Sequence, residues 1–229
     1  MKTELCSLFE KSEIPEIPKI LHMVWVGEKE PPQYFWDNLN GWKALMPNWT
    51  FMVWTNETIT EQGMPKQFLD LLKRCRNGAQ MADLLSYFAI ERYGGYLMDA
   101  DVIPIRSLDE LDTQGKDVIL CHDLPEITCN YISTGFFGAV PHHQLFKNLV
   151  NTSYQIDLTD PDQQVTTGPG HMGNEWFKID WFKNGGYLML PYWAFYRNRI
   201  GDPGPYIPDR IMRDHPDAFG NHFYAASWV

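Results

Sequence analysis

The stretch ADLLSYFAIERYGGYLMDADV, residues 82–102, decides the fold. Together with the preceding methionine, its apolar side chains fall at positions i, i+3, i+4, i+7 and i+8, and these are Met81, Leu84, Leu85, Phe88 and Ala89. This spacing predicts a helix over residues 79–93 with one face in the core. Gly94-Gly95 ends the helix, because glycine readily takes the left-handed conformation found at helix ends. Residues 96–98 then predict a short strand that leads directly into Asp99-Ala100-Asp101.

Strand and helix patterns alternate on both sides of this stretch. Strands are predicted at residues 17–27, 49–55, 118–121, 135–140 and 187–190, and helices at residues 33–46, 65–76, 142–152 and roughly 171–183. This alternation predicts an α/β fold with a mainly parallel central sheet flanked by helices. From Pro191 on, proline, glycine and aromatic residues dominate, which predicts an irregular C-terminal segment over the site. Because such sheets bind ligands beyond the carboxyl ends of their strands, the residues directly after each strand are the candidates.

Length and charge limit the function classes. The chain has 229 residues, which predicts a single domain over residues 1–229, with residues 1–13 as a weakly ordered lead-in. Nineteen basic and 29 acidic residues give a net charge of -10 without a basic cluster, so nucleic-acid binding is not expected. Nine tryptophans favour a platform for a flat ligand or a sugar, and core packing is the plain alternative.

Cysteine usage and hydropathy predict the compartment. The four cysteines form no CxxC pair, and a chain of this size needs no disulfides, so reduced thiols in the cytoplasm are expected. The N-terminus, residues 1–16, is of mixed charge with several acidic residues and lacks the apolar segment of a signal peptide. No apolar run approaches 18 residues, so no transmembrane helix is expected. These features predict a soluble cytoplasmic protein or a domain of a longer one.

The acidic pair Asp99 and Asp101 predicts a metal site. Two carboxylates at i and i+2 after a strand can turn toward one hard cation such as Mn²⁺ or Mg²⁺. A cation held in this way keeps positions open for diphosphate oxygens and neutralises charge on a leaving phosphate. The same pattern recurs at Asp160-Pro161-Asp162, but no strand precedes it, so a solvated turn before a helix is expected there. A solvated turn is also the alternative for Asp99 and Asp101.

The stretch 82–102 resembles the SDxxRY…GGxYxDxD block of glycosyltransferase family 32, the sugar-binding DXD transferases. This family includes mannosyl- and galactosyltransferases and capsular-polysaccharide enzymes, and large glucosylating toxin domains are distant relatives. Four further segments are similar to family motifs in the expected order: IPKILHMVW at residues 17–25, residues 42–55 with Pro47 and Trp49, Thr167-Gly168-Pro169, and HFYAASW at residues 222–228. Each motif is modest alone, whereas the ordered set covers nearly the whole chain.

The resemblance implies a reaction and its cofactor. It implies a GT-A fold, a nucleotide-diphosphate-sugar donor and a divalent metal, usually Mn²⁺. The enzyme would be a retaining hexosyltransferase that moves a sugar to a hydroxyl of a glycan acceptor, as in polysaccharide biosynthesis. A UDP-sugar is favoured because many relatives use one, although mannosyl members use GDP-sugars.

The resemblance also implies a donor site. Trp25 would stack on the nucleobase, and Asp83 would bind ribose or sugar hydroxyls. Ser227 and Trp228 would close over the diphosphate. Ser86 stands where the family has arginine, and its short, uncharged hydroxyl predicts a different donor sugar or pose. It shares a helix face with Asp83 at i, i+3, so it is predicted to contact the same ligand.

The metal ligands follow from the same resemblance. Asp101 would bind the metal directly, Asp99 would bind the donor and the metal, and Ala100 between them would line the donor site. His222 would be a further ligand, since neutral imidazole suits Mn²⁺. No carboxylate has a motif that marks it as a nucleophile, and three are available: Asp123, Glu126 and Glu175. By analogy with the family, attack on the same face as the departing phosphate is preferred, with the leaving phosphate oxygen as the base.

Other polar and aromatic segments are weaker candidates for the donor or acceptor site. Residues 130–135, with Asn130 and Ser133, face either the donor or the acceptor, or form a plain polar loop. Residues 168–171 either shape the acceptor side of the site or form a simple turn. The aromatic residues at 192–196 form a sugar platform or the segment's own core. His22 is expected to be structural.

Two rival functions use parts of the same pattern. A metal-dependent phosphoryl-transfer enzyme or hydrolase would also use Asp99 and Asp101, but it would not need Trp25. A carbohydrate-binding protein without catalysis would explain the aromatic residues but not the acidic pair.

Overall fold

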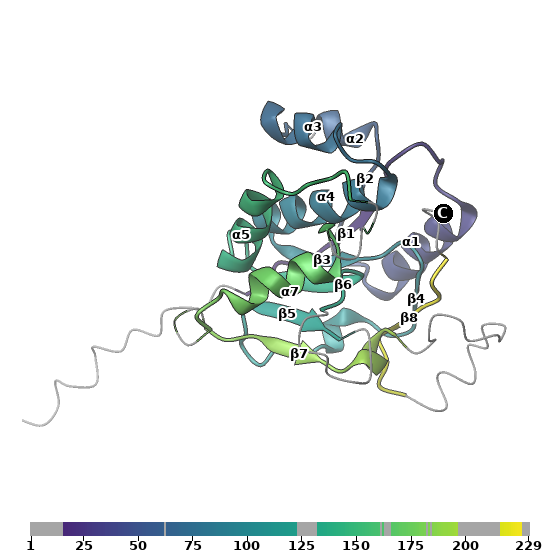
Figure 1. The fold of residues 1–229 in the computed structure, drawn as a ribbon. Coiled ribbons are helices and arrows are strands. Elements are labelled where there is room, and N and C mark those ends of the chain that lie inside the picture. The colour runs from purple at the N-terminus through teal and green to yellow at the C-terminus, as the bar shows by residue number, and fades with distance from the viewer. Residues whose placement is uncertain are drawn as a thin grey trace, which may run out of the picture.

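A six-stranded sheet forms the centre of the molecule (Figure 1). The computed structural model describes residues 16–61, 63–122, 132–160, 162, 166–181, 183, 185–196 and 216–225. The strands of the sheet are β1 (Ile20–Val24), β2 (Thr50–Trp54), β3 (Gly95–Met98), β5 (Val118–Cys121), β6 (Phe136–Ala139) and β7 (Leu188–Leu190). Their order is β2-β1-β3-β6-β5-β7, and β6 alone among them runs antiparallel to its neighbours. The mainly parallel sheet expected from the sequence is confirmed.

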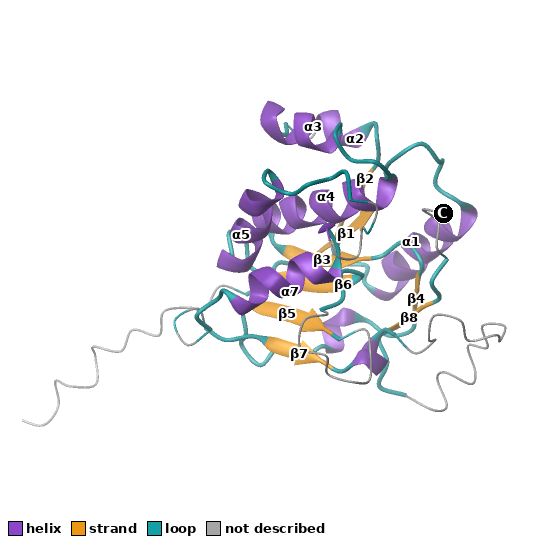
Figure 2. Ribbon diagram, viewed as in Figure 1, coloured by secondary structure: helices purple, strands orange, loops and turns teal. Residues whose placement is uncertain are grey.

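Helices lie on both faces of the sheet (Figure 2). They are α1 (Gln33–Leu45), α2 (Thr58–Glu61), α3 (Lys66–Leu72), α4 (Gly78–Tyr93), α5 (Gln144–Ser153) and α7 (Pro169–Phe177), with short 3-10 turns η1 (Leu108–Glu110) and η2 (Tyr192–Ala194). The predicted helices are confirmed with shifted ends, and α2 was not predicted. Within the described part of the chain, each helix is too short or too polar to cross a lipid bilayer.

Two core clusters, one on each face, follow from strand alternation. In β3, Tyr96 and Met98 point into the cluster that contains Trp42 of α1. Leu97 points to the other face, where it packs in the cluster that contains Leu85 of α4. Successive strand residues point to opposite faces, so the almost continuous apolar run of β3 fits a strand buried on both sides.

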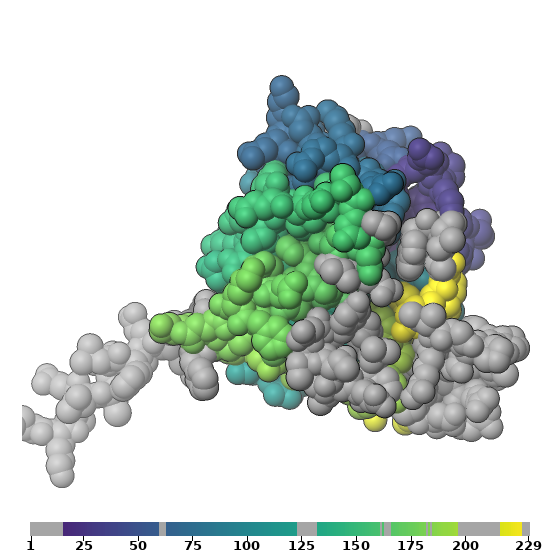
Figure 3. All heavy atoms as spheres, viewed as in Figure 1, coloured from purple at the N-terminus to yellow at the C-terminus, as the bar shows by residue number. Residues whose placement is uncertain are grey.

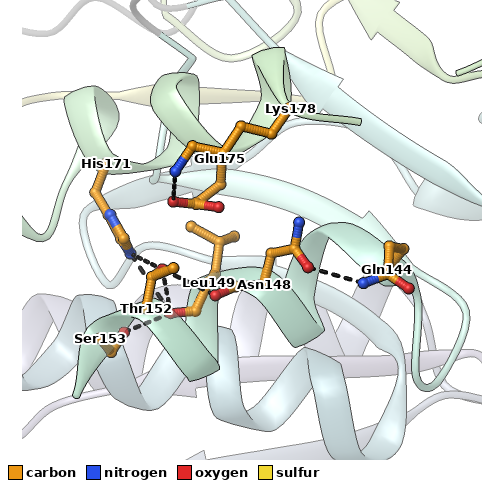
Figure 4. A network of polar contacts seen from close by, with 8 residues as sticks. All are labelled: Gln144, Asn148, Leu149, Thr152, Ser153, His171, Glu175 and Lys178. Atoms are coloured by element: carbon orange, nitrogen blue, oxygen red, sulfur yellow. Dashed lines mark hydrogen bonds and ion pairs between the residues drawn. The ribbon is translucent and has the colours of Figure 1, made fainter. Parts of the chain in front are cut away.

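The side chains that join α5 and α7 are partly polar (Figure 4). His171 of α7 directs its Nε2 atom at the Leu149 carbonyl oxygen (3.5 Å) and the Thr152 hydroxyl (3.4 Å) of α5. Glu175 is buried and accepts a 2.6 Å hydrogen bond from Lys178. Helix α7 ends at residue 177 rather than near 183, because the Lys178 N–H closes a tight last turn onto the carbonyls before it.

A second, two-stranded sheet was not predicted. Strands β4 (Val102–Pro104) and β8 (Gly220–His222) pair antiparallel, with Val102 opposite His222. In Figure 3 the yellow C-terminal residues lie near the purple N-terminal part of the chain, which includes α1, the helix that contacts β4. Three-residue strands carry almost no periodic signal, and their pairing joins segments far apart in sequence. Residues 1–15 and 197–215 lie outside the described residues, so the expected lead-in and most of the irregular C-terminal segment stay predictions.

His22 on β1 is a structural histidine. Its ring is fully buried between the Gly94 carbonyl oxygen, 2.8 Å from Nε2, and the Trp54 indole N–H, which donates to Nδ1 at 3.1 Å. One ring nitrogen donates and the other accepts, so these contacts fit the neutral ring only. Burial lowers its pKa to about 4, although the hydrogen bond to Gly94 acts in the opposite direction.

We expect the buried, neutral His22 to make the folded protein less stable at acid pH than at neutral pH. Its pKa is near 6.5 in the unfolded chain and about 4 in the folded one, so the unfolded chain binds more protons between these values. The free energy of unfolding should fall by about 3 kcal/mol as pH drops through this window. Urea unfolding at pH 7 and pH 4.5 measures it. His22→Gln should lose less stability between these pH values than the wild type, and an equal loss would contradict the assignment.

Candidate active site

Asp99, Asp101 and His222 form a cluster beyond the carboxyl end of β3. One ligand atom of each lies within 4.8 Å of the others, and no second such group of three occurs in the described residues. The His222 Nε2 atom lies 3.0 Å from Asp101 Oδ1 and 3.3 Å from Asp99 Oδ2. The β4–β8 pairing brings His222 there, since it holds this residue opposite Val102. The structure thus brings together the three residues predicted as metal ligands.

Backbone hydrogen bonds hold the acidic turn in place. The Asp99 N–H donates to the Gly135 carbonyl oxygen (2.9 Å), and the Val102 N–H closes the turn onto the Asp99 carbonyl oxygen (3.2 Å). From the C-terminal segment, the Ala225 N–H donates to Asp101 Oδ2 at 2.7 Å. Asp101 therefore has one carboxylate oxygen fixed by the backbone and the other beside His222.

The cluster carries a shared charge. Burial alone would lower the pKa of His222, but the charge and hydrogen bond of Asp101, and then Asp99, raise it to about 10. Burial alone would raise the pKa of Asp101, but the charge and hydrogen bond of His222 and the Ala225 N–H hold it below its usual value. At neutral pH an imidazolium therefore lies against the Asp101 carboxylate, whereas burial and the charge of Asp101 raise the pKa of Asp99 above its usual value.

These residues fit a divalent cation. Two carboxylates and an imidazole are the donors that suit Mn²⁺, and the imidazolium already marks a place where the cluster requires positive charge. The side chains of Asp101 and His222 are 10% and 6% exposed, whereas that of Asp99 is 43% exposed. The cluster is therefore open on the Asp99 side, where a ligand from solvent can reach it.

Gly135 lies directly against the cluster. A Cβ atom at this position would be 2.8 Å from Asp99 Oδ2 and 2.6 Å from the Tyr196 hydroxyl. That hydroxyl is also hydrogen-bonded to the Ser133 hydroxyl, which accepts from the Gly135 N–H at 3.0 Å. The Tyr196 ring is buried and cannot yield easily, so a methyl group at this position would push against the more exposed Asp99 carboxylate.

We expect Gly135→Ala to weaken Mn²⁺ binding by about tenfold, because the new methyl group displaces the Asp99 carboxylate. Gly115→Ala is the matched control. Its Cβ meets nothing within 4 Å, but its φ of +65° costs about 1 kcal/mol with a side chain. Calorimetric Mn²⁺ titrations and melting temperatures separate the two effects. Equal Mn²⁺ affinities in both variants would show that Gly135 does not shape the cluster.

Trp25 follows β1, and aromatic rings connect it to the cluster. Its indole N–H donates to the Lys29 carbonyl oxygen at 2.8 Å, and its ring is partly exposed. Tyr34 lies edge-on between Trp25, at a ring distance of 6.1 Å, and Phe223, at 5.2 Å. The Phe223 N–H in turn donates to the Asp101 carbonyl oxygen. Tyr34 and Phe223 were not predicted, although Phe223 directly follows His222 in the closing motif.

Asp83 and Ser86 lie on α4 in different environments. Asp83 is half-buried, and its Oδ2 accepts a 2.8 Å hydrogen bond from Thr167 of the predicted TGP motif. Ser86 is 3% exposed, and its hydroxyl donates to the Ala82 carbonyl oxygen at 2.7 Å. The Ser86 hydroxyl is therefore engaged within its own helix.

Several other candidates lie in the core or outside the described residues. Phe195 stacks on Phe136 at 4.0 Å and Tyr196 is buried, so these two rings belong to the core rather than to an exposed platform. Residues 169–171 begin α7. Glu175 is bonded to Lys178 in the α5–α7 contact. Outside the described residues lie Asp123, Glu126, Asn130, Ser227 and Trp228.

A family model and several known proteins are similar to this chain. Residues 32–118 match the family model described as "Glycosyltransferase sugar-binding region containing DXD motif". The "Inositol phosphoceramide mannosyltransferase 1" of Schizosaccharomyces pombe is 24% identical over 94% of this chain and 63% of its own length. The "Mannosyl phosphorylinositol ceramide synthase CSH1" of Saccharomyces cerevisiae is 28% identical over 74% of this chain and 45% of its own. The chain thus spans less than two thirds of the length of these curated relatives.

A solved structure is similar in fold. The "PaToxG Glycosyltransferase" superposes with a TM-score of 0.57 over 71% of this chain and 69% of its own, at 12% sequence identity. At this identity the similarity shows the fold alone. The expected GT-A arrangement is confirmed, and the expected resemblance to the DXD family is confirmed by the match over residues 32–118.

Proposed function

We propose that this chain is a metal-dependent, retaining glycosyltransferase, because residues 32–118 match the sugar-binding region of the DXD glycosyltransferases and the chain has a GT-A fold. It moves a sugar from a nucleotide-diphosphate sugar to a hydroxyl group of an acceptor. The observation that carries the proposal is the cluster of Asp99, Asp101 and His222 beyond the carboxyl end of β3. Ligands of such sheets bind at this edge.

Asp99, Asp101 and His222 would hold Mn²⁺ or Mg²⁺. When bound, the cation supplies positive charge against the diphosphate that leaves the sugar. Asp101 contributes the oxygen beside His222, while the Ala225 N–H keeps its second oxygen engaged. Asp99, which is the most exposed of the three, is the group best placed to meet the donor.

The donor binds along the aromatic residues and α4. Trp25 stacks on the nucleobase, and Tyr34 and Phe223 fill the space between it and the cluster. Asp83 binds a hydroxyl of the ribose or of the sugar while Thr167 fixes its carboxylate. A closing role of Ser227 and Trp228 over the diphosphate is part of the same proposal.

Retention follows from attack on the face that the phosphate leaves. The bond from the anomeric carbon to the phosphate oxygen breaks, the bond to the acceptor oxygen forms, and the acceptor proton passes to the leaving phosphate oxygen. The position of Glu175 fits this route, because this carboxylate lies in the contact between α5 and α7, where it is paired with Lys178 (Figure 4). Proton NMR of the first product reports the anomeric configuration, and an inverted product would contradict the route.

The sugar is proposed to be mannose. The names of both fungal relatives combine a mannosyl group with an inositol-containing ceramide. An inositol phosphoceramide is therefore the first acceptor to test. The sequence favours a uridine nucleotide through the wider resemblance, whereas mannosyl members of the family use GDP-sugars. Donor screens therefore need both nucleobases. The cytoplasmic compartment stays a prediction.

A thermal-shift and calorimetric screen of UDP- and GDP-sugars, with and without Mn²⁺, tests the donor site. At least one nucleotide sugar should bind more tightly with Mn²⁺, and the product should contain the transferred sugar. If Mn²⁺ strengthens the binding of none of them, the donor site is wrong. Release of phosphate from simple substrates without sugar transfer would favour a hydrolase instead.

A further inference from the structure

Asn38 is a buried polar residue on an apolar helix face. The face of α1 that packs on the sheet consists of Phe35, Asn38, Leu39 and Trp42. Asn38 is 6% exposed, and its amide nitrogen donates to the Ala100 carbonyl oxygen at 2.8 Å. One turn further along α1, the indole N–H of the fully buried Trp42 donates to the Val102 carbonyl oxygen at 3.3 Å. Two side chains at i, i+4 thus contact the same short segment of backbone.

This segment is the acidic turn, and its carbonyl groups can be accounted for one by one. The Asp99 carbonyl oxygen accepts from the Val102 N–H, and the Asp101 carbonyl oxygen accepts from the Phe223 N–H. The remaining two, on Ala100 and Val102, receive their donors from α1. Buried carbonyl groups without a donor are costly, so all four contacts restrict the turn.

The two contacts from α1 lie on either side of Asp101. The Ala100 carbonyl group belongs to the peptide that enters Asp101, and the Val102 carbonyl group lies one residue beyond it. Rotation of the first peptide would turn the Asp101 Cα and carry its carboxylate away from His222, which the pairing of β8 with β4 holds opposite Val102. The α1 side chains therefore restrain the orientation of Asp101 through the backbone on either side of it, and not through its carboxylate.

We infer that Asn38 and Trp42 are positioning residues for the metal centre, which hold the Asp99–Val102 turn so that the Asp101 carboxylate faces His222. The inference rests on the proposed function, because it concerns the affinity of the proposed metal site. Groups that orient metal ligands from behind typically change metal affinity by about 10- to 100-fold when they are lost. The stronger contact is the shorter one, so Asn38 should contribute more than Trp42.

The test compares Asn38→Leu with Asn40→Leu. The first replaces a buried donor by an apolar side chain of similar volume, and the second makes the same change at an exposed position of the same helix. The probe is Mn²⁺ alone, followed through the electron paramagnetic resonance signal of the free ion. We expect Asn38→Leu to bind Mn²⁺ about tenfold more weakly than the wild type, and Asn40→Leu to bind it like the wild type. Melting temperatures without metal report stability separately.

Trp42→Phe keeps the inference testable if Asn38→Leu does not fold. It removes the indole N–H and leaves an aromatic ring in the core, and it should weaken Mn²⁺ binding by a smaller factor. A folded Asn38→Leu or Trp42→Phe variant with lower melting temperature and unchanged Mn²⁺ affinity would overturn the positioning role alone. A wild-type protein that binds no Mn²⁺ would overturn the proposed metal dependence, and the positioning role with it.

Discussion

Asp101→Asn is expected to abolish detectable Mn²⁺ binding and to reduce sugar transfer by about 10³-fold or more. A bound cation contributes several kcal/mol to the stabilisation of a leaving phosphate, and about 1.4 kcal/mol corresponds to each factor of ten. Both Asp101 oxygens face donors, one the Ala225 N–H and the other the His222 ring. An amide has only one acceptor oxygen, so in either orientation its NH₂ group would face a donor or the metal.

The chain offers a matched control in its second Asp-x-Asp sequence. Asp160 Oδ1 accepts from the Asp162 N–H at 2.9 Å within an exposed turn, which an asparagine oxygen can also do. Asp160→Asn should therefore leave Mn²⁺ affinity and transfer unchanged. Calorimetry with Mn²⁺ and product formation from a nucleotide sugar measure both variants. Transfer by Asp101→Asn at the rate of Asp160→Asn would refute the catalytic assignment of the acidic pair.

These two aspartate pairs also illustrate how far sequence reasoning reaches. Both carry the same three-residue pattern, and only the apolar strand before Asp99 distinguishes them. That context predicted a metal site for Asp99 and Asp101 and a solvated turn at Asp160. The structure brings the first pair together with His222, while Asp160 and Asp162 are exposed and joined by one hydrogen bond. Local pattern was sufficient because the strand, the glycine pair and the carboxylates are contiguous.

Contacts between segments that are far apart in the sequence were harder to predict. His222 was expected only through the closing motif, and its approach depends on β8, a three-residue strand that pairs with β4. Asn38 gave no signal, because a polar residue in a helix usually faces solvent and nothing local shows that Ala100 lies opposite. The expectation that Ser86 contacts the donor stays a prediction, and the hydrogen bond that its hydroxyl makes within α4 does not favour it. A helix serine readily bonds the carbonyl group four residues earlier, and here it does so.

His222→Phe should give a different result from the loss of Asp101. Phenylalanine can keep the ring contacts with Tyr224, 4.2 Å away, and Tyr196, 5.4 Å away, but it offers no ligand atom. Without metal, the variant leaves the carboxylates of Asp99 and Asp101 close together without the imidazolium between them. Removal of one partner from a buried charged group typically costs about 3 kcal/mol, so the melting temperature in EDTA should fall.

Mn²⁺ should partly reverse both the loss of stability and the loss of sugar transfer in His222→Phe. Asp99 and Asp101 remain as ligands, so the variant should bind Mn²⁺ about 10- to 100-fold more weakly and regain transfer as Mn²⁺ is raised. His142→Phe is the control, because His142 is exposed and pairs with Glu91 rather than with the cluster. Activity against Mn²⁺ concentration and melting temperature with and without Mn²⁺ decide the matter. If His222→Phe requires no more Mn²⁺ than His142→Phe, then His222 neutralises the two carboxylates in the metal-free protein and is not a ligand of the metal.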